Sequence, residues 1–455
     1  MKIRKLQLKN IGVFDDETIE FKPCLARDKA EIHILTGQNG SGKSTVLLAM
    51  AAGFYHGKEF PDKLDETSPS TFLVNYEVGL RKRFRSNETT NFVKIYTDTL
   101  QREFGFAKNE RDIYDDGDIM VAGYSREGLE AEEIRASVSN FEIVEYRVAM
   151  SQKKPPPVLF GVFAYSGYRF VKSERIELLK ENTENPLDGS LDFIKSYEKF
   201  TINQWLANNL SQRALAKEEG NFKDAKEFDD NLESLATLIS VIVGYKIDFK
   251  LRFSPTQLVL KIKDDELDFD TLPDGLRSLI SWVGDLLMRI HLLRWRDELP
   301  IFEKNLILLL DEIEVHLHPA WQRKVLPVIQ RLFKNSQIFI STHSPFVVNS
   351  VDDAWVYKLK LENGKGGISQ PIRSEDGISY QTVLSDIFGV NEEFGGKTQD
   401  ELDKFYSIVR NGNEFNDNEL KELALSLADQ SEELNAIVQI ELRQFNRRHH
   451  KDISL

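Results

Sequence analysis

The sequence contains a single cysteine, Cys24, among 455 residues. One cysteine excludes an intramolecular disulfide framework and fits a reducing compartment. The first residues, MKIRKLQLKN, alternate charged and apolar side chains and lack the apolar core of a signal peptide. The longest apolar runs, such as VLFGVFAY and LILLL, fall far short of a membrane span. We therefore expect a cytoplasmic protein that does not enter a membrane.

Positive charge is also scarce, because 59 Lys and Arg stand against 73 Asp and Glu and give a formal net charge of −14. A chain with this balance does not attract nucleic acid over its whole surface. The cluster RKRFR at residues 81–85 could form a local basic patch, but a solvated strand edge or loop is the simpler interpretation. The hydrophobic content of 41% is instead normal for a soluble globular protein. Its length allows about two or three domains.

Strand and helix patterns alternate along the chain and predict an α/β fold. Alternating segments open it, and the apolar run EIHILTG leads through GQNGSGKST into a compact apolar helix. Further strand patterns occupy residues 71–80, 91–97, 141–150 and 158–170, and a charged helical hairpin occupies about 190–245. Alternating residues at 246–253 and 257–263 predict a strand pair, and the spacing of Leu402, Phe405 and Val409 predicts a helical tail. We predict four regions: an N-terminal half of a nucleotide-binding head (1–185), a helical hairpin insertion (186–247), a C-terminal half of the head (248–395) and a helical tail (396–455).

The segment GQNGSGKS at residues 37–44 matches the P-loop pattern G-x-x-x-x-G-K-[ST] and stands between a strand and a helix. Glycines let backbone amides converge on phosphate oxygens, and the helix N-terminus favours their negative charge. The lysine then holds the β- and γ-phosphates, and the hydroxyl after it ligates Mg²⁺. The pattern thus predicts ATP and Mg²⁺ as ligands. The predicted nucleotide-binding residues are Gly37, Gln38, Asn39, Gly40, Ser41, Gly42, Lys43, Ser44 and Thr45.

Two later strands end in polar residues that suit the same chemistry. The buried run NLILLL ends at Asp311, which we expect beside Ser44 in the Mg²⁺ shell, and Glu312 follows as the base for the attacking water. An acidic pair at a strand end can also cap a helix, but a P-loop in the same chain favours catalysis. The strand pattern SQIFIST is followed by His343, which we predict to sense the γ-phosphate.

Taken in order, GQNGSGKST, LILLLDE and STHS resemble the ABC-type ATPase heads of the SMC, RecF and OLD families. Asp311 follows Lys43 by 268 positions (from 43 to 311), which is more than in ABC transporter cassettes and implies a large insertion. The resemblance implies an α/β P-loop NTPase fold of the ABC-ATPase head type. It also implies an antiparallel β-lobe, a helical insertion between Walker A and Walker B, and a helical C-terminal tail.

In ABC-type heads a signature loop begins a helix upstream of Walker B, and LPDGLRS at residues 272–278 occupies that place. The resemblance implies that Asp274 and Gly275 reach the nucleotide of a second head from this helix N-terminus. Pro273 replaces the serine of the LSGGQ pattern, whose hydroxyl contacts phosphate. We therefore expect slow hydrolysis and a long-lived ATP-bound assembly. The residues that predict one apolar face on this helix are Leu276, Ile280, Val283, Leu287 and Ile290.

The segment DEIEVHLHP is similar to the Walker B and D-loop segment of OLD-like, RecF-related ATPases of prokaryotic immunity. His316 and His318 have the spacing of a chelating pair, but no cysteine or third ligand lies nearby in the sequence. We expect them to shape the D-loop at a dimer interface. In FAYSGYR, Arg169 either contacts nucleotide or a neighbouring lobe, or is a surface arginine beside core aromatics. The sequence does not place the glutamine of a Q-loop.

In length and layout the chain resembles the standalone ATPase subunit of Septu-type anti-phage systems, with the ATPase subunit of PARIS-type defence as a near neighbour. The resemblance implies a homo-oligomer of head-to-head dimers that sandwich ATP and control a partner nuclease, of HNH type or alternatively Toprim type. DNA or a phage component is the implied trigger.

Two alternatives stay open. One is a DNA-repair head of RecF or SMC type, which the acidic charge and the lack of long heptads disfavour. The other is an OLD-type enzyme with its own nuclease centre. A Toprim centre needs an Asp-x-Asp, and the sequence after His343 contains none.

Overall fold

The computed structural model describes residues 2–54, 90–98, 101–107, 120–125, 157–158, 160–167, 176, 186, 190–191, 193, 202–253, 256–375, 378–411 and 417–455. The predicted strands at 71–80 and 141–150, the cluster RKRFR and Arg169 lie outside these residues. The chain divides into two compact units, Met1–Val383 and Leu384–Leu455.

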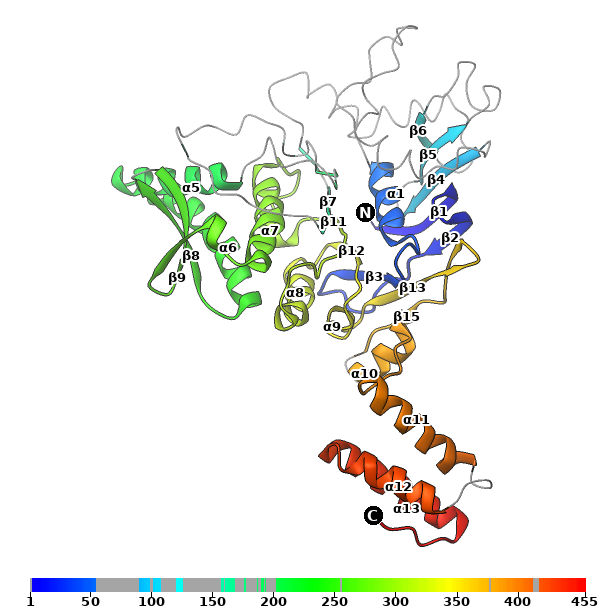
Figure 1. The fold of residues 1–455 in the computed structure, drawn as a ribbon. Helices are drawn as coiled ribbons and strands as arrows, with labels where there is room; N and C mark the ends of the chain where they lie inside the picture. Colours follow the sequence, from blue (N-terminus) through cyan, green and yellow to red (C-terminus); the bar gives the residue numbers. More distant parts are fainter. Residues whose placement is uncertain are drawn as a thin grey trace. The chain divides into compact units, whose positions relative to one another are not determined.

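A mostly parallel sheet carries the predicted motifs of the first unit (Figure 1). The strands run in the order β14-β13-β3-β12-β11-β7, and β15 pairs with β13. The five strands from β13 to β7 are parallel, and β14 and β15 are antiparallel to β13. The bounds are β3 (Glu31–Gly37), β7 (Gly161–Tyr165), β11 (Leu306–Leu310), β12 (Gln337–Ser341), β13 (Trp355–Glu362), β14 (Lys365–Ile368) and β15 (Ile372–Arg373).

Strands β3, β7, β11 and β12 have the continuous apolar runs of a sheet buried on both faces, and nearly all of their residues are buried. Ligands of such parallel sheets bind outside the carboxyl ends of the strands. The loops after β3, β7, β11 and β12 therefore meet at one edge, and three of them carry the predicted motifs.

A second sheet forms the predicted antiparallel β-lobe, in the order β2-β1-β4-β5-β6. Helix α1 packs against both sheets, because Val46, Leu47 and Met50 share one core with β1 residues and with Leu309 of β11. The bounds are β1 (Ile3–Ile11), β2 (Phe14–Glu20), α1 (Lys43–Phe54), β4 (Thr90–Thr97), β5 (Gln101–Ala107) and β6 (Met120–Ser125).

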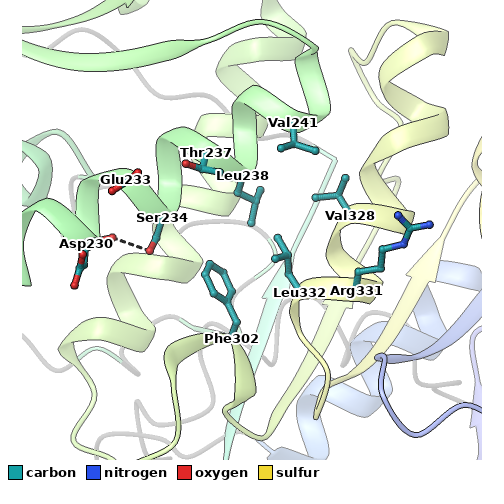
Figure 2. Close-up of a pocket in the computed structure, with 10 residues that line it drawn as sticks. All are labelled: Asp230, Glu233, Ser234, Thr237, Leu238, Val241, Phe302, Val328, Arg331 and Leu332. Atoms are coloured by element: carbon teal, nitrogen blue, oxygen red, sulfur yellow. Dashed lines mark hydrogen bonds between the residues drawn. The ribbon is translucent and has the colours of Figure 1, made fainter.

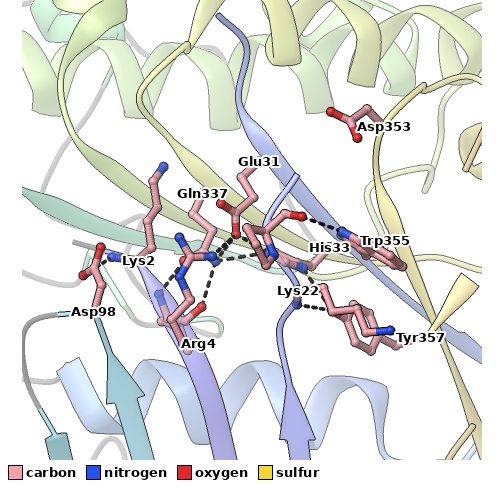
Figure 3. Close-up of polar contacts among 12 residues, drawn as sticks. Lys2, Arg4, Lys22, Glu31, His33, Asp98, Gln337, Asp353, Trp355 and Tyr357 are labelled. Atoms are coloured by element: carbon pink, nitrogen blue, oxygen red, sulfur yellow. Dashed lines mark hydrogen bonds and ion pairs between the residues drawn. The ribbon is translucent and has the colours of Figure 1, made fainter. Parts of the chain in front are cut away.

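A buried polar cluster joins the two sheets at the end away from the carboxyl edge (Figure 3). The His33 ring is fully buried and lies 2.9 Å from Glu31 Oε1 through its Nε2 atom. Arg4 of β1 donates to the same Glu31 oxygen at 2.7 Å. The Gln337 side-chain amide donates to Glu31 at 2.9 Å, donates to the Ile3 carbonyl and accepts from the Ile3 amide. The cluster fixes the β-lobe to the strand that leads into the P-loop.

Between the P-loop helix and β11, the structure contains a pair of antiparallel helices, a three-stranded antiparallel sheet and a long buried helix. The predicted strand pair after residue 245 is confirmed as β8 and β9. Helix α7 was predicted to present one apolar face, but its residues from Gly275 to Ile290 are buried except for Arg277. The bounds are α5 (Ile202–Glu218), α6 (Phe222–Val243), β8 (Ile247–Phe253), β9 (Thr256–Ile262), β10 (Asp265–Asp268), the 3-10 turn η4 (Phe269–Thr271) and α7 (Asp274–Leu292).

Short helices complete the first unit around the carboxyl edge and its flanks. Helix α8 follows the DEIEVHLHP segment, and α9 follows His343. The remaining bounds of this unit are the 3-10 turn η5 (Ile301–Glu303), α8 (Pro319–Leu332), α9 (Pro345–Val348) and α10 (Tyr380–Thr382). The π-helix η6 (Val383–Phe388) begins at the last residue of the first unit and continues into the second.

The second unit is helical and has a core of its own. Phe405, Val409, Ala424 and Val438 are fully buried in this core, so the apolar spacing that predicted a helical tail reflects packing among these helices. The bounds are α11 (Gly396–Asn411), α12 (Asp417–Ala428) and α13 (Glu432–His449).

Candidate nucleotide-binding site

The loop between β3 and α1 has a backbone that only glycine adopts readily. Gly37, Gly40 and Gly42 have φ values of +143°, +78° and +100°, which side-chain-bearing residues rarely adopt. A Cβ at Gly37 would lie 2.3 Å from the Leu359 carbonyl oxygen, and one at Gly42 would lie 2.6 Å from the Phe14 ring. The loop therefore needs glycine both for its conformation and for its close packing.

Lys43 points into this loop. Its Nζ donates to the carbonyl oxygens of Gly37 and Gln38, both at 2.9 Å, and the residue is 6% exposed. Burial lowers the pKa of Lys43, against attraction from the three carboxylates that follow β11. The ammonium thus lies between the loop and those carboxylates, where a phosphate would sit.

The other predicted loop residues divide by exposure. Gln38, Asn39 and Gly40 are exposed at the tip of the loop, whereas Ser41 and Thr45 are buried. The Ser41 amide closes the turn by donating to the Gln38 carbonyl at 3.2 Å. The exposed tip and the glycine-rich backbone leave amide groups accessible to an anion.

Asp311 meets Ser44 at the carboxyl edge of the sheet. The Ser44 hydroxyl donates to Asp311 Oδ1 at 3.0 Å, and Ser341 at the end of β12 donates to the same oxygen. The Asp311 amide donates to the Tyr165 carbonyl at 2.8 Å, which fixes the end of β11 against β7. A hydroxyl and a carboxylate are the hard oxygen ligands that Mg²⁺ prefers, so these residues fit the cation.

Glu312 occupies a strained turn immediately after Asp311. Its φ is +49°, and its amide donates to the Ser341 hydroxyl at 2.8 Å. The carboxylate lies over Gly167, where a Cβ would be 2.8 Å from Glu312 Oε2 and 3.1 Å from Glu312 Cβ. Positive φ at a residue with a long side chain is uncommon, and strained residues of this kind cluster at functional sites.

Gly167 was not among the predicted site residues. In the FAYSGYR segment the candidate was Arg169, which lies outside the described residues. The pairing of β7 with β11 brings Gly167 to Glu312 instead. The only sequence signal was a glycine at the end of an apolar run, which also occurs in ordinary turns.

His343 follows β12 at the same edge. Its amide donates to Glu314 Oε1 at 2.5 Å, and its side chain is exposed. Burial and the positive charge of Lys43 lower the pKa of His343, against attraction from Asp311. This shift favours the neutral imidazole, which can donate one N–H to a phosphate oxygen.

Glu314 is a further carboxylate of this site that sequence reasoning missed. Burial raises its pKa, against its hydrogen bonds with the His343 amide and the Thr342 side chain. Glu314 stands three positions after Asp311 in DEIE. The sequence alone did not predict a role for it, because Asp311 and Glu312 already account for the expected acidic pair.

Asp274 and Gly275 begin helix α7, after Pro273 as its N-cap. The Asp274 carboxylate pairs with Arg277 at 2.5 Å. A Cβ at Gly275 would lie 2.5 Å from the His316 carbonyl oxygen, so the LPDGLRS segment adjoins the segment after Walker B. The glycine permits this close approach.

The two histidines of the DEIEVHLHP segment have separate local roles. His316 has a φ of +64° at the turn against Gly275. His318 is the N-cap of α8, and its Nδ1 accepts from the Ala320 amide at 3.2 Å. Within the part of the chain that the structure describes, no group of three or more His, Cys, Asp or Glu side chains could hold a metal ion by itself.

A sequence model described as "AAA domain" matches residues 5–241. The chain belongs to this AAA-domain family. A second model, described as "AAA domain, putative AbiEii toxin, Type IV TA system", matches residues 158–349. Together the two matches cover both strands that carry the P-loop and the acidic pair.

Curated relatives are about 24% identical to this chain over the aligned residues. "Retron Ec83 probable ATPase" of Escherichia coli is 24% identical over 79% of this chain and 72% of its own length. "Septu protein PtuA" of Bacillus thuringiensis is 24% identical over 51% of this chain and 59% of its own length. A PtuA of Bacillus mycoides is 23% identical over 92% of this chain, which spans half of that relative.

Among solved structures, an SMC head bound to the C-winged helix domain of ScpA aligns with 82% of this chain and 98% of its own. The identity is 15% and the TM-score is 0.43. The assignment to the ABC-type P-loop fold therefore rests on the strand order, the P-loop and the family match. The strand order, the P-loop and the family match confirm the predicted fold class.

A groove of about 480 Å³ lies elsewhere on the first unit (Figure 2). Its apolar lining includes Leu238 and Val241 of α6, Phe302, and Val328 and Leu332 of α8. It shares no residue with the nucleotide-binding site. No helix of the described residues is long and apolar enough to cross a membrane.

Proposed function

We propose that this AAA-domain protein binds and slowly hydrolyses ATP as the regulatory subunit of a prokaryotic anti-phage defence complex. The observation that carries the proposal is the convergence of Lys43, Ser44 and Asp311 with Glu312 and His343 at one edge of the parallel sheet. The relatives named as Septu and retron ATPases support the defence role.

The residues present define the steps of hydrolysis. Lys43 exchanges its two carbonyl partners in the loop for β- and γ-phosphate oxygens. Ser44 and Asp311 would hold Mg²⁺, which supplies charge neutralisation on the phosphates when bound. Glu312 accepts a proton from the attacking water, and His343 donates an N–H to the γ-phosphate.

The LPDGLRS segment supports a nucleotide-binding site that is shared between two protomers. We infer that Asp274 and Gly275 of one protomer reach the nucleotide of its partner, with α7 presenting its N-terminus. Pro273 cannot supply a hydroxyl, so we expect slow turnover and a long-lived assembly. The ATP-bound dimer then controls a partner nuclease, of HNH or Toprim type, in response to DNA or a phage component.

The ATPase part is tested with purified full-length protein and two variants. Lys43→Ala should abolish ATP binding, whereas Glu312→Gln should bind ATP and trap it without hydrolysis. Lys365→Ala, an exposed lysine on β14, is the matched control. Normal turnover by Glu312→Gln would refute its role as the base.

The regulatory part is tested by co-expression with the neighbouring open reading frames. Co-purification of a nuclease, dependent on ATP and lost in Lys43→Ala, is the expected outcome. Salt-dependent DNA binding by the isolated protein without a partner would favour a repair head instead.

A further inference from the structure

Two turns carry the residues to which the proposed function assigns chemistry beyond phosphate binding. One follows β11 and contains Glu312, and the other follows β12 and contains His343. Both turns leave neighbouring parallel strands of the sheet. The Glu312 amide donates to Ser341 Oγ at 2.8 Å, and the His343 amide donates to Glu314 Oε1 at 2.5 Å, so these two bonds join the turns. Ser344 Oγ donates to Gln322 Oε1 of α8 at 2.6 Å.

Glu314 accepts the hydrogen bond from the His343 amide. Its Oε2 atom is enclosed and sealed from solvent, and the neighbouring Ile313 and Thr342 are buried. A carboxylate so enclosed is costly unless its hydrogen bonds are specific.

The His343 side chain is exposed, so little packing fixes its ring. Its position is set by its main chain, and the amide is anchored only through the carboxylate on the opposite turn. The turn of His343 would therefore shift if that acceptor were removed. Misplacement of a reacting group by about 1 Å can cost roughly 100-fold in rate.

We propose that Glu314 is a positioning residue of the ATPase site. It accepts a hydrogen bond from the His343 amide and so holds the imidazole at a fixed position relative to Glu312. The inference rests on the proposed function. It assigns Glu314 neither a proton transfer nor a metal contact. The acceptor atom matters in this role, and the negative charge does not.

The test compares Glu314→Gln and Glu314→Ala in the full chain by single-turnover ATP hydrolysis and by ATP affinity. Glutamine keeps an acceptor oxygen, so Glu314→Gln should stay within about 3-fold of wild type. Glu314→Ala should lose roughly 10- to 100-fold in kcat, with Kd for ATP changed less than about 3-fold. Glu362→Ala, an exposed carboxylate on β13, is the matched control.

A double-mutant cycle with His343→Ala separates positioning from general destabilisation. If Glu314 acts through His343, the double variant should be no slower than His343→Ala alone. Additive losses, or a Glu314→Gln variant as slow as Glu314→Ala, would overturn the proposal. If Glu314→Ala does not fold, Glu314→Gln decides alone. Wild-type protein without any ATP hydrolysis would instead refute the proposed function, whereas an active wild type with an active Glu314→Ala refutes only this inference.

Discussion

Replacing Gly167 with alanine should slow ATP hydrolysis without preventing ATP binding. The added Cβ would lie 2.8 Å from Glu312 Oε2, 3.1 Å from Glu312 Cβ and 3.3 Å from Val315 Cγ2. Ordinary contact begins at 3.4 Å, so the carboxylate oxygen must recede by about 0.6 Å (3.4 − 2.8). The carboxylate can rotate away, but the contact at Glu312 Cβ also requires a main-chain shift of about 0.3 Å (3.4 − 3.1) against the hydrogen bond to Ser341.

The magnitude follows from that displacement. A shift of about 1 Å in a catalytic group can cost roughly 100-fold in rate, so about 0.6 Å should cost on the order of 10-fold in kcat. The contact at Glu312 Cβ forces a small main-chain shift, so the free energy of unfolding should fall by about 1–3 kcal/mol, the usual cost of overpacking. ATP affinity should change less than about 2-fold, because Lys43 and Ser44 do not contact Gly167.

The assay is single-turnover hydrolysis with ATP affinity and thermal unfolding measured on the same preparations. Gly367→Ala is the matched control, because a Cβ there meets nothing within 4 Å. Wild-type kcat in Gly167→Ala would refute the placement of Glu312 over Gly167. Loss of ATP affinity equal to the loss of kcat would show that the substitution disturbs the P-loop instead.

Three further outcomes are expected. Burial lowers the pKa of His291 to about 4, so the unfolded chain takes up this proton at higher pH than the folded chain does. Neutral His291 therefore contributes fully to the free energy of unfolding above about pH 6.5, and this contribution is lost as pH falls toward 4. The free energy of unfolding should fall by about 2 kcal/mol between pH 7 and 5 from this residue. His291→Phe should flatten that part of the pH dependence in urea unfolding, and an unchanged slope would contradict it. Phe405→Ala should destabilise the second unit by about 3–5 kcal/mol, seen as a lower unfolding temperature with ATP binding retained; loss of ATP binding would show that the units depend on each other. Gly42→Ala should abolish ATP binding, because its Cβ would meet the Phe14 ring at 2.6 Å, and near-normal affinity would refute the required close packing.

Much of the fold could be predicted because its signals are local. Apolar runs of four to six residues that end in polar groups correctly marked β3, β11 and β12, since strands buried on both faces need such runs. Alternating polar and apolar residues marked β1, β2, β8 and β9. The all-round burial of α7 was not predicted, because periodicity records the strongest apolar face and not the number of elements that pack around a helix.

The sequence by itself determined the P-loop and the residue types at the strand ends, because both depend on a few adjacent positions. The G-x-x-x-x-G-K-S spacing fixes where the glycines and Lys43 stand relative to a helix N-terminus. Only the tertiary structure decided which strand ends are neighbours. It placed Gly167 under Glu312 and Glu314 against the His343 amide. These contacts follow from the order of β7, β11 and β12 in the sheet, and residues far apart in the chain carry no local sign of that order.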